Sequence, residues 1–267
     1  MAKIRNVLIL ASESANWKIA GLRQLDRIAL AFGEYARRHR PSQPLLCALA
    51  WDPAIPLRDR WVPHDSRFVA FRIRSEDADV HRGTAIYDLA ISTNMLLTRS
   101  AIDELIDRSR NPATTATEKW DEARMAAERA ASDAHRGVRI LQTEGDLPAA
   151  ERWFLQSMTK PQDGLVSRYL NRPISRQVTR LLLRTRMSPT AWTVAITPIA
   201  AIGCFFLARG DRAGFMVGTL LYQAYSVLDG CDGEIARAKY LESAMGAGLD
   251  KWCDVLAGIA FVFSLGF

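Results

Sequence analysis

The sequence predicts two regions of different fold class: a soluble α/β region, followed by an all-α region that crosses a membrane. The chain has 267 residues and a formal net charge of +6, of which residues 1–186 contribute +8 and residues 187–267 contribute −2. The long uncharged segments lie in the second part. The composition, with 49% hydrophobic and 24% charged residues, excludes a disordered tail, a collagen-like repeat and a disulfide-stapled mini-protein.

The first region alternates strand and helix patterns. Residues 6–11 (NVLILA) form a continuous apolar run, as in a buried parallel strand. Residues 20–38 carry apolar side chains at helical spacing. The other expected strands are 45–50, 68–73 and 85–91, and the other expected helices are 97–109 and 117–135. This alternation predicts an α/β sandwich, which we place at residues 1–160.

The second region contains three uncharged segments. Residues 187–208 carry no charge and are mostly Ala, Ile, Val, Phe or Leu, and about 20 such residues span a bilayer core as a helix. A second segment covers residues 213–228 and a third follows Asp254. The alternative is a buried core helix, which seldom runs so long without charge. We therefore expect three spans in a transmembrane domain at residues 191–267, after an amphipathic juxtamembrane helix within 161–190.

Arginines recur before the first uncharged segment. No acidic residue occurs from Leu165 to Gly210, and the arginines lie at positions 168, 172, 176, 180, 184 and 186. By the positive-inside rule, this side of the membrane and the domain that precedes it are cytoplasmic. We expect a multi-pass protein of the plasma or inner membrane. The arginine-rich helix either lies at the interface and binds anionic lipid headgroups, or uses one or two arginines to bind a phosphate.

Four aspartates lie where a membrane helix disfavours charge. Asp229 and Asp232 are three residues apart, and Asp250 and Asp254 are four apart, so each pair shares one face of a helix. Carboxylates near a membrane boundary are costly unless a cation neutralises them. The hard ions Mg²⁺ and Mn²⁺ prefer carboxylate oxygens and leave positions for phosphate. The alternative is a set of solvated helix ends, which this spacing disfavours.

Residues 229–254 read DGCDGEIARAKYLESAMGAGLDKWCD. They match all eight fixed positions of the pattern D-x-x-D-G-x-x-A-R-x8-G-x-x-x-D-x-x-x-D, and the chain thereby resembles the CDP-alcohol phosphotransferase (CDP-alcohol phosphatidyltransferase) family. The resemblance implies a membrane enzyme that moves a phosphoalcohol from a CDP-alcohol, such as CDP-diacylglycerol, to an acceptor hydroxyl and releases CMP. It places this reaction in phospholipid or inositol-phosphate-type biosynthesis. It also implies a homodimer and no nucleic-acid partner.

The resemblance assigns roles to individual residues. Asp229, Asp232 and Asp250 would hold Mg²⁺ or Mn²⁺, and Asp254 would share metal binding with the role of general base. The CDP-alcohol would contact Asp229, Gly233, Ala236, Arg237 and Gly246. Arg172 and Arg176 are the candidates for binding a phosphate on the acceptor. Family members usually carry six spans and this chain supplies three, so the resemblance predicts a second domain that is cut short.

The first region resembles the nucleotidyltransferase domain of bifunctional inositol-phosphate cytidylyltransferase/phosphotransferase proteins. That family has a Gly-rich turn with an arginine after its first strand, whose backbone N–H groups hold nucleotide phosphates. Here the turn at residues 12–17 (SESANW) contains no glycine and includes Glu13. This departure favours a degenerate binding or regulatory domain over nucleotidyl transfer. For the whole chain, the alternative to the transferase is a catalytically silent, membrane-anchored module that binds a nucleotide or a partner.

Overall fold

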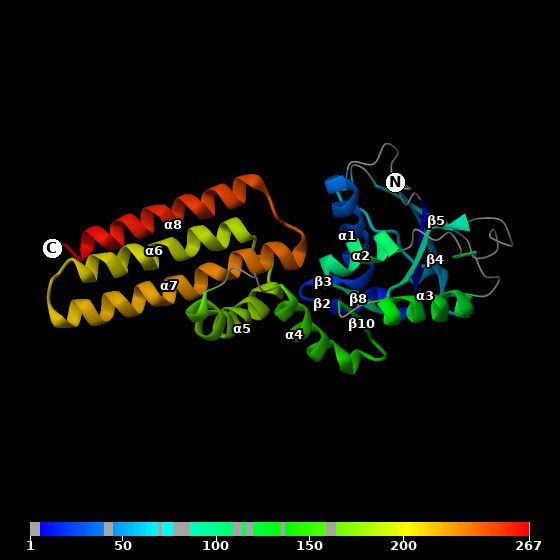
Figure 1. Cartoon of the computed structure of the whole chain (residues 1–267), viewed down its shortest axis with the longest axis horizontal. Helices are drawn as coiled ribbons and strands as arrows, with labels where there is room; N and C mark the ends of the chain where they lie inside the picture. The colour runs from blue at the N-terminus through cyan, green and yellow to red at the C-terminus, as the bar shows by residue number, and fades with distance from the viewer. Residues whose placement is uncertain are drawn as a thin grey trace. The chain divides into compact units, whose positions relative to one another are not determined.

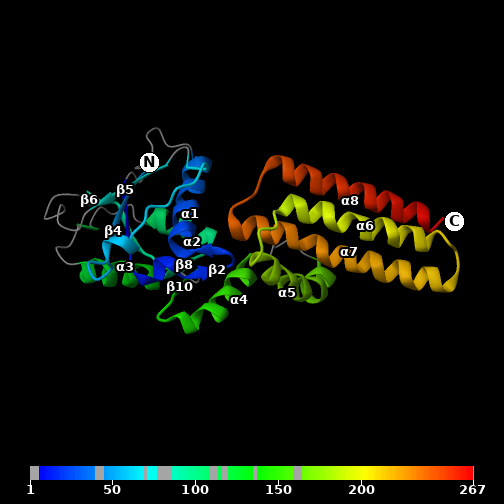
Figure 2. The ribbon, with the colours of Figure 1, turned by 180° about the vertical axis from the view of Figure 1, so that it is seen from behind.

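The structure is a computed structural model that describes residues 6–39, 45–68, 71–76, 86–108, 114–115, 120–134, 137–158 and 164–266. The chain divides into two compact units, residues 1–157 and 158–267. Figure 1 labels their helices and strands, and Figure 2 shows the same elements from behind. Each unit is described by itself.

A parallel four-stranded sheet forms the centre of the first unit. Its order is β5-β4-β1-β7, from β1 (Asn6–Ala11), β4 (Leu45–Trp51), β5 (Phe71–Glu76) and β7 (Leu89–Ser92). The strand order reverses at β1, which pairs with β4 on one side and β7 on the other. In doubly wound α/β folds, ligands bind outside the carboxyl ends of the strands at such a reversal. The expected α/β architecture is therefore present.

Helices and short strands surround this sheet. Helix α1 (Gln24–His39) contacts β5, and α3 (Trp120–Ala134) contacts β1 and β7. The remaining elements are α2 (Arg99–Arg108), α4 (Leu147–Ser157) and the two-stranded pairs β2 (Lys18–Ile19) with β3 (Leu22–Arg23), β6 (Ile86–Tyr87) with β9 (Thr114–Thr115), and β8 (Met95–Leu97) with β10 (Val138–Ile140). The side chains of Val7 and Ile9 on β1 and of Phe32 on α1 are fully buried, so both elements contribute to the core.

Several expected boundaries differ from the structure. The expected helix at 20–38 begins at Gln24, because Ala20 and Gly21 both adopt positive φ (47° and 78°) in the turn between β2 and β3. Positive φ at both central residues is the geometry of a tight two-residue hairpin. The expected helix at 97–109 begins at Arg99, since residues 95–97 pair with β10.

Two expected strands also shift. The strand expected at 68–73 is found as β5, and positions 69–70 of that expectation lie outside the described residues. The strand expected at 85–91 is divided into β6 and β7, because Asp88 between them bonds with Asn6 through both its backbone N–H and its carboxylate. The expected helix at 117–135 is α3, whose flanking positions are not among the described residues.

The second unit is helical. A short π-helical turn (Ser167–Asn171) precedes α5 (Arg172–Leu183), and α6 (Pro189–Leu207), α7 (Arg212–Lys239) and α8 (Ala244–Ser264) follow. Helix α7 contacts α5 and α6, and α8 contacts α6. Ser188, Asp211 and Ser243 cap the amino termini of α6, α7 and α8 by accepting a backbone hydrogen bond. The three expected uncharged segments thus fall on three successive helices.

Glycines bring α6 and α7 into close contact. Gly203 lies on α6, and Gly214 and Gly218 lie four residues apart on α7. A Cβ atom on Gly218 would lie 2.7 Å from the carbonyl oxygen of Gly203 and 2.9 Å from the backbone nitrogen of Leu207. Small residues at this spacing allow helix backbones to approach one another, a common device in membrane helices.

Among the described residues, one helix is long and apolar enough to cross a membrane. It is α6, with a mean hydropathy of 1.8 and 33% of its apolar window buried. Length and composition of this kind also occur in core helices of soluble proteins. Helices α7 and α8 do not meet the criterion, because the carboxylates of the signature lie on them. Three spans therefore stay a prediction.

Candidate active site

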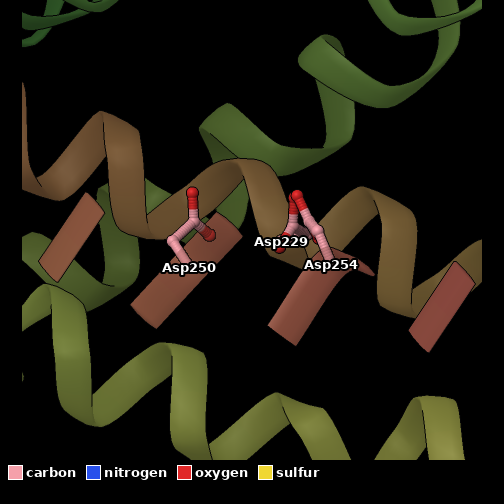
Figure 3. Close-up of side chains that lie close together, drawn as sticks. All are labelled: Asp229, Asp250 and Asp254. Carbon is pink, nitrogen blue, oxygen red and sulfur yellow. The ribbon is translucent and has the colours of Figure 1, made fainter. Parts of the chain in front are cut away.

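Three of the four predicted aspartates converge. Asp229 comes from α7, and Asp250 and Asp254 come from successive turns of α8. Each contributes a carboxylate oxygen, and these oxygens all lie within 4.8 Å of one another. In Figure 3 the side chains of Asp229 and Asp254 end next to each other, with Asp250 beside them along α8. The i, i+4 spacing places both α8 carboxylates on one face of that helix.

Asp254 and Asp229 differ in their hydrogen bonding. Tyr225 of α7 donates a hydrogen bond from its hydroxyl to Asp254 Oδ1 at 3.2 Å. Asp229 Oδ1 is buried and accepts no hydrogen bond within the described part of the chain. Burying a charge without an opposite charge or a donor is costly. A divalent cation with a preference for oxygen ligands would satisfy this atom and offset two of the three negative charges, so the donor set fits such an ion.

Asp232 occupies a different position from the other three. Its Oδ2 atom accepts a hydrogen bond from the hydroxyl of Thr193 on α6, and Oδ1 accepts one from the backbone N–H of Gly233. Its side chain is nearly buried, with 7% of the residue exposed. The sequence did not identify Thr193 or Tyr225, although a polar residue within the apolar segment 187–208 was a signal that could have pointed to Thr193.

A cavity of about 220 Å³ adjoins the carboxylates. Its walls come from α6, α7, α8 and the connection between α7 and α8. Six predicted residues line it: Asp232, Gly233, Ala236, Arg237, Gly246 and Asp250. A Cβ atom on Gly233 would lie 3.1 Å from the guanidinium of Arg237, so the glycine leaves room for that side chain. Small residues and one cation beside a carboxylate group suit a phosphorylated ligand with its counter-ion.

The two predicted acceptor-phosphate arginines lie on α5. Arg172 forms an ion pair with Glu234 of α7 at 3.2 Å, and 12% of the Arg172 side chain is exposed. Arg176 follows one turn later on the same helix. Neither is among the residues that line the cavity. Arg172 therefore contacts the signature segment at Glu234, outside the cavity.

In the first unit, the turn after β1 is closed by side chains. Ser14 Oγ lies 2.7 Å from Thr93 Oγ1 and 2.9 Å from Ser12 Oγ, and the backbone N–H of Ser12 donates to Thr93 Oγ1. Ser14 and Thr93 are 2% and 0% exposed. The turn itself forms a short 3-10 helix at residues 13–16. The position where a Gly-rich turn would hold phosphates is thus filled by a hydroxyl network.

Carboxylates from two helices beside a cavity with a lining arginine are typical of metal-dependent phosphoryl-transfer proteins. Residues 187–267 match the model of the CDP-alcohol phosphatidyltransferase family. This match confirms the resemblance to that family drawn from residues 229–254.

Several relatives are similar to about half of this chain. A protein from Rubrobacter xylanophilus is 40% identical over 124 residues, which cover 44% of this chain and 28% of the relative. Proteins from Thermococcus kodakarensis and Archaeoglobus fulgidus are each 32% identical, over 49% and 45% of this chain and 29% and 24% of their own lengths. All three are named bifunctional IPC transferase and DIPP synthase. The chain spans less than a third of the length of these relatives.

Proposed function

We propose that this chain is a CDP-alcohol phosphotransferase, which transfers a phosphoalcohol group from a CDP-alcohol to an acceptor hydroxyl and releases CMP. The observation that carries the proposal is the convergence of Asp229, Asp250 and Asp254 within 4.8 Å, beside a cavity lined by other residues of the family signature. The family match over residues 187–267 supports it.

Mg²⁺ or Mn²⁺ would be held by Asp229, Asp250 and Asp254, with Asp232 at the edge of the cavity. When bound, the divalent ion supplies positive charge that neutralises the pyrophosphate of the donor and the charge that develops on departing CMP. Thr193 holds the Asp232 carboxylate by a hydrogen bond, which fixes its direction toward the cavity. The buried, unsatisfied Oδ1 of Asp229 supports a cation at this position.

The donor would occupy the cavity between α6, α7 and α8. Gly233, Ala236 and Gly246 keep its walls free of large side chains, so the cytidine and pyrophosphate have room. Arg237 lines the same cavity and is always protonated, and its planar guanidinium can donate two parallel hydrogen bonds to phosphate oxygens. These contacts would orient the donor with its reacting phosphorus toward the carboxylates.

Asp254 would act as the general base. It is more exposed than Asp229 and Asp250, and the Tyr225 hydroxyl holds one of its two carboxylate oxygens. The other oxygen would take the proton from the acceptor hydroxyl as the new bond from the acceptor oxygen to phosphorus forms. The bond from this phosphorus to the bridging oxygen of CMP breaks. CMP leaves with that oxygen and with the electron pair of the broken bond. A base must lie within hydrogen-bond reach of the proton that it removes.

The acceptor would belong to phospholipid or inositol-phosphate-type metabolism. The names of the relatives, IPC transferase and DIPP synthase, support this class. Arg172 and Arg176 remain the predicted contacts for a phosphate on the acceptor. Because Arg172 is paired with Glu234, an acceptor phosphate would have to share its guanidinium.

We further propose a multi-pass protein of the cell membrane, with the first unit and the active site on the cytoplasmic side. Large apolar side chains are exposed on all three long helices, including Phe205 on α6, Leu220 on α7 and Phe263 on α8, each 67–69% exposed. On α5, Ile174 and Leu181 are exposed. Lipid contact would remove these surfaces from water. A homodimer, as the resemblance implies, would cover part of the same surface.

For the first unit, we propose a binding or regulatory role without nucleotidyl transfer. The hydroxyl network of Ser12, Ser14 and Thr93 supports this role, because it occupies the place of the phosphate-binding turn. If the second unit is also inactive, the chain is a membrane-anchored module that binds a nucleotide or a partner.

One assay separates these functions. The full chain, purified in detergent, is supplied with Mg²⁺ or Mn²⁺, a series of CDP-alcohols and the acceptors inositol phosphate, glycerol phosphate and serine. The transferase releases CMP with at least one donor and acceptor pair, and that pair identifies the substrates. A folded protein that releases no CMP with any pair would favour the silent binding module.

A further inference from the structure

Glu234 is a buried carboxylate of the signature segment, and the proposed reaction does not use it. It follows Asp232 and Gly233 directly in the sequence, but it is not among the residues that line the cavity. It is 3% exposed, and its carboxylate accepts hydrogen bonds on both oxygens. The donors are Arg172 Nη1 and Ser175 Oγ to Oε1, at 3.2 and 3.0 Å, and Thr179 Oγ1 to Oε2 at 2.6 Å.

All three donors come from α5, and they share one face of it. Positions 172, 175 and 179 recur at helical spacing. Of the α5 residues that are buried, Ser175 and Thr179 are polar and only Leu183 is apolar. On the opposite face, Ile174 and Leu181 are 46% and 64% exposed. The helix therefore turns its polar face toward the protein and its apolar face outward.

On the α5 side, Leu183 is therefore the only fully buried apolar residue in this arrangement. Polar groups form a large part of the contact between α5 and α7, and Glu234 accepts three of these hydrogen bonds. Arg172 also donates to the carbonyl oxygen of Gly230 at 3.5 Å, and Gly230 carries no side chain that would prevent this approach. Hydrogen bonds that involve a buried ionised group are stronger than neutral ones, and removing one partner leaves the others without compensation.

We propose that Glu234 is a positioning residue for the metal and donor site. By holding α5 on the outer side of α7, it fixes the segment of α7 that carries Asp229, Asp232 and Arg237, five residues before to three residues after Glu234 in the chain. The expected effect on catalysis rests on the proposed function. The expected effect of the α5 contact on the position of the α7 carboxylates does not depend on that function.

The test uses the full chain in detergent and three variants at this contact. Glu234→Ala removes the acceptor, Glu234→Gln keeps an acceptor without the charge, and Thr179→Val removes the 2.6 Å hydrogen bond with little change of shape. The matched control is Thr185→Val, because Thr185 lies just beyond the same helix and its hydroxyl donates locally to the carbonyl oxygen of Leu182. The readouts are the Kd for Mn²⁺, followed by electron paramagnetic resonance, and kcat and KM for the CDP-alcohol.

Glu234→Ala should weaken Mn²⁺ binding about tenfold and lower kcat about tenfold. This is the change that corresponds to the loss of one strong hydrogen bond to a charged group. Glu234→Gln should restore part of both. Thr179→Val should change both by about threefold, and Thr185→Val should match the wild type. A role confined to holding the fold would lower thermal stability and leave the Kd for Mn²⁺ of the folded protein unchanged.

The outcomes are distinct. If Glu234→Ala fails to fold, Thr179→Val is the deciding variant, because it preserves the ion pair between Glu234 and Arg172. A wild-type Kd for Mn²⁺ together with a wild-type kcat in Thr179→Val would overturn the proposal. A wild-type protein that binds Mn²⁺ but releases no CMP contradicts the proposed function only. Should the wild type bind no Mn²⁺, hydrogen exchange of residues 225–237 in Glu234→Ala decides, and exchange as slow as in the wild type overturns the proposal.

Discussion

The two units of the molecule both gather polar side chains, but they satisfy them differently. In the first unit, the hydroxyls of Ser12, Ser14 and Thr93 meet at the reversal of strand order and bond to one another. In the second unit, Asp229, Asp250 and Asp254 meet as three carboxylates. Hydroxyls both donate and accept, so they can form a closed network without a ligand. Ionised carboxylates only accept, so they need a cation or a donor from outside the group.

This difference predicts that the second unit, rather than the first, binds a cation. In the first unit, the three hydroxyls satisfy one another in the turn after β1. Three carboxylates close together repel one another, and a cation that bound them would stabilise the unit. Variants in each unit test this contrast.

The largest effect is expected for Asp254→Asn. An amide cannot take the proton of the acceptor, so kcat should fall by about 10²- to 10⁴-fold, the usual contribution of a general base, while CDP-alcohol binding is largely retained. CMP release and donor binding measure the two effects. Asp211→Asn is the matched control, because Asp211 caps α7 and asparagine caps helices equally well. Near-normal turnover in Asp254→Asn would remove Asp254 as the base.

Removal of the divalent cation is expected to affect the second unit alone. EDTA should abolish CMP release and lower the thermal stability of the helical unit, by about 2.7 kcal/mol if the ion had been present at 100 times its Kd. Added Mg²⁺ or Mn²⁺ should restore both. In Asp229→Asn, unfolding should no longer respond to EDTA. Full turnover in EDTA would exclude a required metal, and the comparison of the two units would then lose its basis.

A smaller effect is expected where α6 and α7 touch. In Gly218→Ala the new methyl group would lie against the backbone of Gly203 and Leu207, so the helices must separate, at a cost of about 1–3 kcal/mol. Thermal unfolding in detergent measures the change. The control is Gly258→Ala on α8, where no atom lies within 4 Å of an added Cβ. It should be neutral or more stable by up to about 1 kcal/mol. Equal behaviour of the two variants would show that this glycine contact does not matter.

The smallest effect is expected in the first unit. Ser14→Ala leaves the buried hydroxyl of Thr93 with one partner fewer, so unfolding in urea should become easier by about 1 kcal/mol. CMP release should be unchanged. The exposed Ser66 provides the control, and Ser66→Ala should alter stability by less than about 0.5 kcal/mol. A large loss of CMP release in Ser14→Ala would show that the first unit takes part in the reaction.

Much of this structure follows from local sequence patterns. The apolar run at 6–11 is β1 with the same bounds, and the carboxylate spacing predicted which side chains of α8 share a face. Contacts between distant segments were not predictable. The bond from Thr193 to Asp232 depends on how α6 meets α7, and the partners of Glu234 depend on how α5 meets α7. The hairpin at Ala20 and Gly21 was also not predicted, because the helical spacing of apolar residues carries no information about positive φ angles.

The connection between α7 and α8 sets the alignment of the two halves of the signature. It begins at Tyr240, which ends α7 in the left-handed conformation (φ 55°, ψ 40°), and it finishes at Ser243, which caps α8. One residue added within α8 ahead of Asp250 would rotate the remainder of the helix by about 100° and advance it by about 1.5 Å. Asp250 and Asp254 would then face away from Asp229. The number of α8 residues between Ser243 and Asp250 therefore sets how the α8 carboxylates align with Asp229.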